Sequence, residues 1–204
     1  MSARTAEKIL FIDTSGPSLQ LALAGAGLSA SFVEDIARGH AEILFDRLAG
    51  FLAGNETSYK DLTRVGVTTG PGSFTGLRIG ISAARGLSLA LDIPAIGVPN
   101  LLALSLCGPK NPHVVIVAAR REQAYVQQFS APGQPRGGPE LLALTVAEKF
   151  LPAENFSVLK DPLLDIVRTA QFALEAKEDD FPPHPSYVRA ADAKPQTKMR
   201  IARK

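Results

Sequence analysis

Residues 68–80 read TTGPGSFTGLRIG, a stretch that holds four glycines and one proline in thirteen positions. A phosphate-binding P-loop has the pattern G-x-x-x-x-G-K-[ST], but Leu77 and Arg78 follow Gly76 here. A dinucleotide fingerprint, G-x-G-x-x-G, would need its third glycine one residue before Gly76, so that match is weak. The glycines therefore raise a different question, which is how closely the next segment approaches its neighbours.

The segment after the glycine loop has the periodicity of a helix with one face that is nearly free of side chains. Small residues recur every four positions at Gly76, Gly80 and Ala84, with Ala83 and Leu87 beside them. A glycine inside a helix costs about 1 kcal/mol relative to alanine, so two of them indicate a structural or functional reason. Two interpretations stay open: close packing of this helix on its own sheet, or a close contact with a helix of another chain.

The first half of the chain alternates between strand-like and helix-like patterns. Apolar or alternating runs predict strands, and helical periodicity predicts helices. The predicted order is three strands, a helix, a strand, a helix and a strand, at residues 8–15, 18–25, 28–35, 40–54, 61–69, 75–91 and 93–99.

The pattern begins again after a segment rich in glycine and proline near residues 105–112. The second half is predicted to contain strands at 113–119, 123–129 and 156–160 and helices at 145–151 and 162–176. Two similar halves favour a duplicated α/β architecture over a single doubly wound sheet. We expect an N-terminal lobe at 1–107, a C-terminal lobe at 108–188 and a basic, partly ordered tail at 189–204.

The composition is that of an ordinary globular chain, since 46% of its 204 residues are hydrophobic and 21% are charged. No apolar run approaches the ~20 residues of a membrane helix, and the N-terminus lacks a signal-peptide core. We therefore expect a soluble, cytoplasmic protein with no membrane contact. The formal net charge is +2, but the last sixteen residues carry six basic side chains and one acidic side chain. Such a tail is either solvated or contacts RNA phosphate or an acidic partner.

Four segments carry a resemblance to a known family. They are ILFIDTS at 9–15, HAEILFDRL at 40–48, GVTTGPGSFTGLRIGISAARGLSLALDIPAIGVPNLLAL at 66–104 and PSYVR at 185–189. The chain resembles the TsaB (YeaZ) family of bacterial tRNA threonylcarbamoyladenosine biosynthesis proteins, densely over residues 8–105 and thinly beyond them. The resemblance implies an α/β, two-lobed actin-like and Hsp70-like fold (ASKHA, RNase H-like) with duplicated βββαβα halves, of which the second is shortened.

The resemblance also implies a function. Family members resemble degenerate relatives of TsaD, the catalytic subunit that transfers a threonylcarbamoyl group to adenosine 37 of tRNA. This implies a non-catalytic scaffold and activator subunit of the t6A37 synthesis complex, which binds TsaD, works with the ATPase TsaE and reaches tRNA only through the complex. Alone, such a chain is expected to form a homodimer through the same helices, at 40–52 and 75–91.

We expect the partner contact to use residues of these two helices, with arginine at its rim. The predicted partner-binding residues are Ile43, Leu44, Arg47, Leu48, Gly76, Arg78, Gly80, Ala83, Ala84 and Leu87. Two alternatives remain: a stand-alone actin-like nucleotide-binding protein or ATPase, motivated by Asp13 and the glycine loop, and an RNA-binding module, motivated by the basic tail.

Catalytic relatives of the family carry H-x-x-x-H after the fifth strand, a pair that ligates a metal. In this sequence the two places fall on Asn100 and Leu104, and leucine cannot ligate. We therefore expect no metal, no cofactor and no enzymatic activity. Relatives often have an aspartate at the position of Ala118, so this alanine also indicates that the chain is not an enzyme.

Asp13 and Ser15 end the first strand, where this fold class often keeps an acid for metal or phosphate. We expect them to form mainly a turn, with residual phosphate binding as the minority alternative. A serine-peptidase mechanism is poorly supported, because no histidine lies near Ser73 in the sequence. His40 is expected to cap a helix or to lie on the surface.

Overall fold

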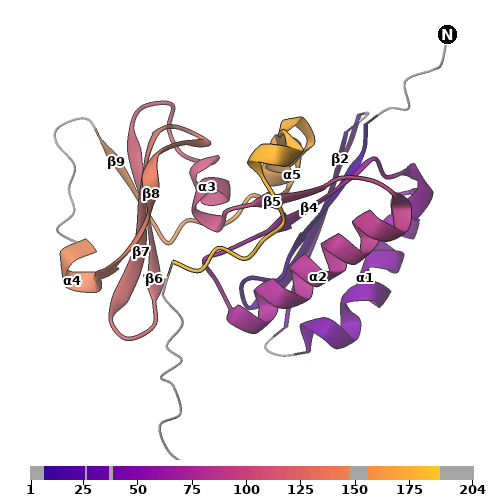
Figure 1. The fold of residues 1–204 in the computed structure, drawn as a ribbon, viewed down its shortest axis with the longest axis horizontal. Helices are drawn as coiled ribbons and strands as arrows, with labels where there is room; N and C mark the ends of the chain where they lie inside the picture. Colours follow the sequence, from indigo (N-terminus) through magenta and orange to yellow (C-terminus); the bar gives the residue numbers. More distant parts are fainter. Residues whose placement is uncertain (1–6, 26, 37–38, 148–155, 189–204) are drawn as a thin grey trace, which may run out of the picture.

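The computed structural model describes residues 7–25, 27–36, 39–147 and 156–188, so the predicted basic tail lies outside the described residues. The described chain forms two mixed β-sheets with helices beside and between them (Figure 1). The first sheet has the strand order β3-β2-β1-β4-β5, and the second has the order β8-β7-β6-β9.

The first sheet begins as an antiparallel meander and continues in parallel. Its strands are β1 (Ile9–Asp13), β2 (Ser18–Gly25), β3 (Leu28–Asp35), β4 (Arg64–Thr68) and β5 (Ala95–Val98). β1 pairs antiparallel with β2 and parallel with β4, which in turn pairs parallel with β5. Parallel pairing needs crossover helices. They are α1 (His40–Gly54), which a 3-10 turn (Tyr59–Asp61) follows, and α2 (Phe74–Leu91).

β1 is apolar at four successive positions because both faces of the first sheet are covered. Leu10 and Ile12 pack in one core with residues of α1 and α2. Ile9 and Phe11 point to the other face, where they pack with α3 (Asn100–Ser105) and α5 (Ile166–Glu175). Figure 1 shows α1 and α2 together on one side of this sheet and α5 on the other.

The second half repeats the order of the first. Its elements are β6 (His113–Ala119), β7 (Gln123–Ala131), β8 (Gln134–Ala143), α4 (Leu144–Ala147), β9 (Ser157–Lys160), α5 and a 3-10 turn (Glu178–Asp180). β6 pairs antiparallel with β7 and parallel with β9, as β1 does with β2 and β4. The predicted fold class, with duplicated βββαβα halves and a shortened second half, is confirmed.

One strand, β8, and one short α-helix, α3, were not predicted from the sequence patterns. β8 has two prolines and two glycines in its first six residues, and it is tolerated because it pairs only with β7, as an edge strand. α3 is only six residues long. The predicted helix at 162–176 starts later than expected, because Asp165 caps it by accepting a hydrogen bond from the Arg168 N–H at 2.9 Å. Leu163 therefore lies outside the helix and is exposed.

The two halves share one hydrophobic core. Val115 and Phe129 of the second sheet belong to the same buried cluster as Ile9, Phe11 and residues of α5. α5 comes from the second half of the chain but packs on β1 and β2 of the first sheet. The division at residue 107 falls in the connection between α3 and β6, and it stays a prediction.

The glycine stripe of α2 lies against the chain's own first sheet. A Cβ at Gly76 would lie 1.9 Å from the Thr14 carbonyl oxygen, and one at Gly80 would lie 2.5 Å from Thr14 Oγ1. Ala84 is fully buried in the same core. Gly76, Gly80 and Ala84 are thus occupied within the folded chain. Of the two interpretations left open by the sequence, the structure shows close packing of this helix on its own sheet.

We predict that Gly76→Ala lowers the free energy of unfolding by about 3 kcal/mol or more, because the new methyl group would overlap a backbone oxygen. Gly86→Ala is the matched control in the same helix, since nothing lies within 4 Å of its Cβ position. It should raise the free energy of unfolding by up to about 1 kcal/mol. Urea denaturation of both variants measures the difference, and equal stabilities would contradict the close approach.

Candidate functional site

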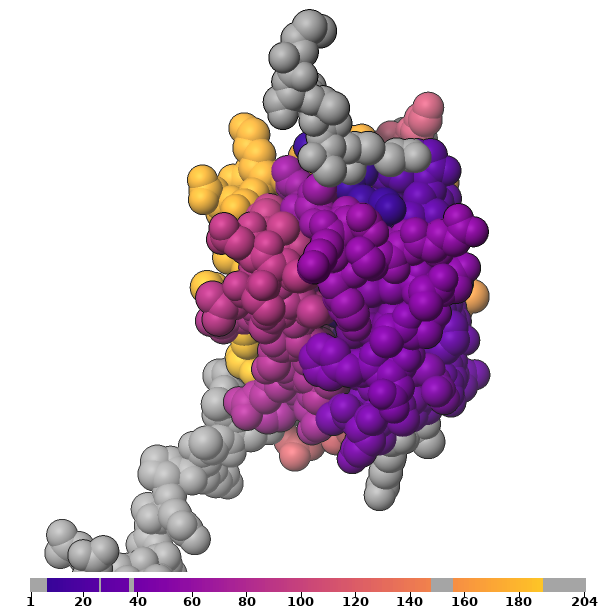
Figure 2. All heavy atoms as spheres, turned by 90° about the vertical axis from the view of Figure 1, so that its right-hand side faces the viewer, coloured from indigo at the N-terminus to yellow at the C-terminus, as the bar shows by residue number. Residues whose placement is uncertain are grey.

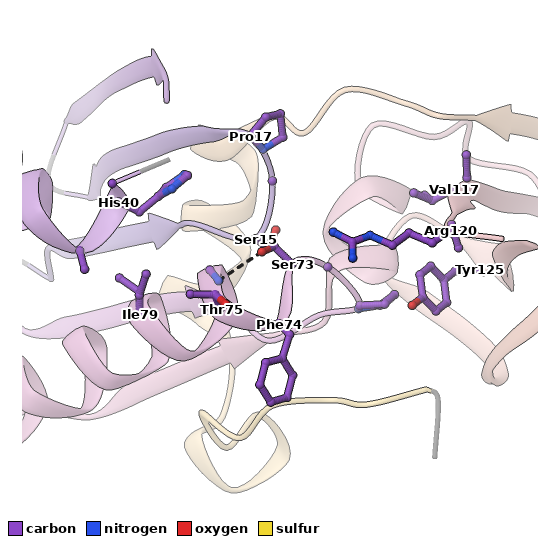
Figure 3. Close-up of a pocket in the computed structure, with 18 of the residues that line it drawn as sticks. Ser15, Pro17, His40, Ser73, Phe74, Thr75, Ile79, Val117, Arg120 and Tyr125 are labelled. Atoms are coloured by element: carbon purple, nitrogen blue, oxygen red, sulfur yellow. Dashed lines mark hydrogen bonds between the residues drawn. The ribbon is translucent and has the colours of Figure 1, made fainter. Parts of the chain in front are cut away.

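A cleft of about 1010 Å³ opens between the two halves of the chain (Figure 3). The first half contributes the turn after β1, the start of α1 and the loop into α2, and the second half contributes the corner between β6 and β7. In Figure 3, Arg120 extends from the second half toward Ser15 and Ser73 of the first. Polar lining residues of the cleft include Ser15, His40, Ser73, Thr75, Arg120 and Tyr125.

The glycine loop is held against the turn that follows β1. The Ser73 N–H donates to the Ser15 carbonyl at 2.7 Å, and a Cβ at Gly72 would lie 2.8 Å from that oxygen. Ser73 is also the N-cap of α2, where its Oγ accepts from the Gly76 N–H at 3.3 Å, shown dashed in Figure 3. The loop thus places the N-terminal turn of α2 at the wall of the cleft.

Asp13 holds this turn from inside. Its side chain is 3% exposed, and its Oδ1 accepts hydrogen bonds from the Ser15 N–H at 3.0 Å and from Thr68 Oγ1 at 2.5 Å. The structure therefore gives Asp13 a role in the turn, and of the two predicted phosphate-binding residues only Ser15 lines the cleft.

Asn100 joins the start of α3 to the glycine loop and to the turn after β1. Its Oδ1 accepts from the Gly70 N–H at 3.0 Å, its Nδ2 donates to Ser15 Oγ at 2.6 Å, and its N–H donates to the Gly70 carbonyl at 2.7 Å. Leu104 packs against the core that the two halves share. These two positions, which correspond to metal ligands in the implied catalytic relatives, are thus used for hydrogen bonding and for apolar packing.

His40 lines the cleft and does not cap α1, so of the two expected roles the structure shows the surface position. Gly39 is the N-cap of α1, and no side chain caps that helix end. The Nε2 atom of His40 is buried without a hydrogen-bond partner in the described chain. Ser73 lines the same cleft as His40, although the two residues lie far apart in the sequence. Its Oγ accepts a hydrogen bond as the cap of α2.

A second hollow, a groove of about 570 Å³, runs between α1 and α2 on the surface. Phe45 of α1 and Phe74 of α2 line it, and they are 53% and 54% exposed. The remaining lining residues are Ala41, Leu44, Thr75, Arg78, Ile79, Ser82 and Ala83. Figure 2 shows the side of the molecule that lies on the right in Figure 1, and residues of the first half of the chain form most of that surface.

The predicted partner-binding residues divide between the groove and the core. Arg78 is exposed in the groove, and Leu44 and Ala83 form its floor, although they are largely buried. Ile43 and Leu87 are half-buried beside the core. Leu48 is fully buried, like Gly80, so neither offers surface to a partner. Both residues face the sheet, and their part in partner binding stays a prediction.

Arg47 is engaged within the chain as well. Its Nε and Nη2 donate to the two carboxylate oxygens of Glu34 on β3, at 2.5 and 2.9 Å. These hydrogen bonds lower the pKa of Glu34 below its ordinary value. The pair is partly buried and ties α1 to the edge strand of the first sheet.

The exposed aromatic residues of the groove could not be singled out from the sequence patterns. Periodicity singled out the apolar positions that the sheet buries, whereas Phe45, Phe74 and Ile79 lie between that buried stripe and solvent. Within the described ranges, no helix is long and apolar enough to cross a membrane. The described residues also contain no group of three or more His, Cys, Asp or Glu side chains placed to hold a metal ion.

This architecture is similar to that of known proteins. A family model described as TsaD, tRNA N6-adenosine threonylcarbamoyltransferase, matches residues 33–155, more than half of the chain. YeaZ from Pseudomonas aeruginosa superposes with a TM-score of 0.72 at 24% identity, over 89% of this chain and 99% of that one. The fold is the two-sheet α/β fold that this YeaZ structure shares.

Curated relatives define the family further. The tRNA threonylcarbamoyladenosine biosynthesis protein TsaB of Escherichia coli is 36% identical over 48% of this chain and 42% of that protein. For TsaB of Bacillus subtilis the identity is 33%, over 57% of this chain and 52% of that protein. An uncharacterized protein of Mycobacterium tuberculosis is 30% identical over 96% of this chain and 98% of its own length.

The chain belongs to the TsaB (YeaZ) family. It spans about half the length of the TsaB relatives from Escherichia coli and Bacillus subtilis.

We predict that Asp13→Ala lowers the free energy of unfolding by about 1–3 kcal/mol, because it leaves the donors of Ser15 and Thr68 without an acceptor. Asp13→Asn keeps an oxygen at the Oδ1 position, so it should lower the free energy of unfolding by less than Asp13→Ala does. Urea denaturation measures both variants. Equal losses for alanine and asparagine would contradict the assigned role of Oδ1 in the turn.

Proposed function

We propose that this chain is a non-catalytic scaffold and activator subunit in the synthesis of threonylcarbamoyladenosine at position 37 of tRNA. Its relatives are named for the biosynthesis of this nucleoside, and the matching family model carries the name of the transferase. In this proposal the chain binds the catalytic subunit TsaD in the cytoplasm, works with the ATPase TsaE and meets tRNA only through the complex.

The groove between α1 and α2 is the observation that carries the proposal. Phe45 and Phe74 are large apolar side chains with more than half of their surface in solvent, and they flank one concave strip. Exposed aromatic residues that border a groove are typical of docking sites, because their burial removes much apolar area from water. Leu44 and Ala83 give the strip an apolar floor.

The shape of this groove suits a helix of a partner. A helix laid between two helices buries its apolar face, and small floor residues such as Ala83 allow its backbone to come close. A second copy of the chain would use the same surface, so homodimerisation and TsaD binding would exclude each other. Arg78 at the rim would set the orientation of the partner more than the affinity.

The proposed lack of catalysis rests on the residues at three positions, Asn100, Leu104 and Asp13. Asn100 and Leu104 stand where the resemblance places metal-ligating histidines, and both are used structurally. Asp13 is likewise engaged in the turn after β1. A scaffold subunit would need the rigid turn after β1 but no metal-ligating or catalytic side chains.

We predict that Phe45→Ala and Phe74→Ala each weaken binding to TsaD from the same organism by about tenfold or more, because central aromatic residues dominate such interfaces. The matched control is Leu89→Ala, an 87% exposed residue of α2 that does not line the groove. Light scattering after size-exclusion chromatography measures the mass of the complex, and isothermal titration calorimetry measures the affinity for TsaD.

The three variants should keep the circular dichroism spectrum and the stability of the original chain, since each removes mostly exposed atoms. Normal binding by both phenylalanine variants, or an equal loss for Leu89→Ala, would reject the groove as the docking site.

The cleft supports a second candidate, a nucleotide-binding protein of the actin-like class. Its volume of about 1010 Å³, the α2 N-terminus and Arg120 are compatible with an anionic ligand. We expect isothermal titration of the chain alone with ATP and with ADP, each with Mg²⁺, to show no binding, since Asp13 is engaged in the turn. Saturable binding that Arg120→Ala abolishes would favour the nucleotide-binding candidate instead.

A further inference from the structure

The last described residues of the chain form a strap along the free edge of the first sheet. We use the term strap for residues 181–187, which leave the 3-10 turn after α5 and run past β5 to the start of α2 (Figure 1). The strap therefore begins on the sheet face that α5 covers and ends on the face that carries the groove.

The first part of the strap is anchored to β5 and α5. The Gly97 N–H of β5 donates to the Phe181 carbonyl at 2.7 Å, and the Phe181 ring packs edge-on against Phe172 with centroids 5.3 Å apart. A Cβ at Gly97 would lie 2.5 Å from the Pro182 carbonyl oxygen. Gly97 thus lets the strap lie directly on the edge strand.

The second part of the strap crosses the glycine loop. The Ser186 N–H donates to the Thr69 carbonyl at 2.8 Å, and the Ser186 carbonyl oxygen lies 3.0 Å from the Cβ position of Gly70. Gly70 has φ +107, a conformation that side chains rarely adopt. The loop that precedes α2 and the strap are therefore fixed to each other through their backbones.

The strap ends in a stack of side chains at the groove. The Tyr187 ring lies 5.6 Å from the Phe74 ring, centroid to centroid, and the Arg78 guanidinium carbon lies 3.9 Å from the Phe74 centroid. Arg78 Nε also lies 3.5 Å from the Tyr187 hydroxyl, a long hydrogen bond. Phe74, Arg78 and Tyr187 thus contact one another in one cluster, and both Phe74 and Arg78 line the groove.

We propose that Tyr187 is a positioning residue of the docking groove, which holds Phe74 and Arg78 in their binding orientation before a partner arrives. Phe74 is more than half exposed, so without the tyrosine ring little would fix its rotamer. A side chain that is already fixed loses less conformational freedom on association, and this raises affinity without a new contact. The inference rests on the proposed function of the groove.

The contact is first tested in the isolated chain. The sequence contains only three tyrosines, so 3-fluorotyrosine labelling gives three ¹⁹F signals, and Tyr187→Phe identifies the one from residue 187. Phe74→Ala should shift the Tyr187 signal and leave that of Tyr59, which packs beside the other core elements, in place. An unmoved Tyr187 signal would overturn the proposal.

The positioning role is tested by a double-mutant cycle on TsaD affinity. We expect Tyr187→Ala to raise Kd by about three- to tenfold and Tyr187→Phe by less than about twofold, since the phenyl ring supplies most of the aromatic contact. In the Phe74→Ala background the same tyrosine change should alter Kd by less than about twofold, because its effect passes through Phe74. His184→Ala, an exposed strap residue away from the groove, should not change Kd.

The outcomes separate this proposal from the proposed function. If the original chain binds TsaD and the effect of Tyr187→Ala is the same with and without Phe74, the strap tyrosine acts on its own and the proposal is wrong. If Tyr187→Ala has no effect on Kd, it is also wrong. If Phe45→Ala and Phe74→Ala bind normally as well, the groove itself fails, and the strap proposal fails with it.

Discussion

The close approach of Thr14 to α2 is the constraint on which the rest of the first half depends. Thr14 follows β1, its Oγ1 donates to the Gly76 carbonyl at 2.7 Å, and its own carbonyl occupies the place where a Gly76 side chain would lie. Gly80 meets the same threonine one helical turn later. With side chains at these two positions, α2 would have to lie farther from the sheet, and the turn after β1 could not be shared between sheet and helix.

This one contact decides which surfaces of α2 remain free. Since Gly76, Gly80 and Ala84 face inward, the residues that flank them turn outward: Phe74, Arg78 and Ser82 line the groove toward α1. The same contact brings Ser73 to the cleft as the N-cap of the helix. The cleft and the groove thus share the first turn of α2 as a common wall, and a change at Phe74 or Thr75 touches both.

The sequence predicted most of the fold because its patterns were strong where burial is strong. β2, β3, α1 and β6 have the predicted bounds, since each combines a clear apolar period with a turn signal. β8 was missed because an edge strand is exposed and tolerates the prolines and glycines that argue against a strand elsewhere. The site was harder to predict. A small-residue stripe indicates close packing but not whether the partner is another chain or the chain's own sheet, and only the position of Thr14 decides it.

The periodicity of the sequence does not identify the residues that form the groove and the strap. Phe45 and Phe74 belong to neither the buried stripe nor the polar face, and Tyr187 reaches Phe74 from 113 positions away in the sequence, so no local pattern connects them. What connects them is the backbone of Gly70 and Gly97, which lets the strap lie on the sheet edge. The glycines of the opening stretch therefore serve two approaches: Gly76 and Gly80 admit the turn after β1, and Gly70 admits the strap that ends beside Phe74. In the proposed docking surface, the aromatic residues lie outside the core and the strap that supports them is fixed through the backbone, so substitutions there should lower affinity without loss of the fold.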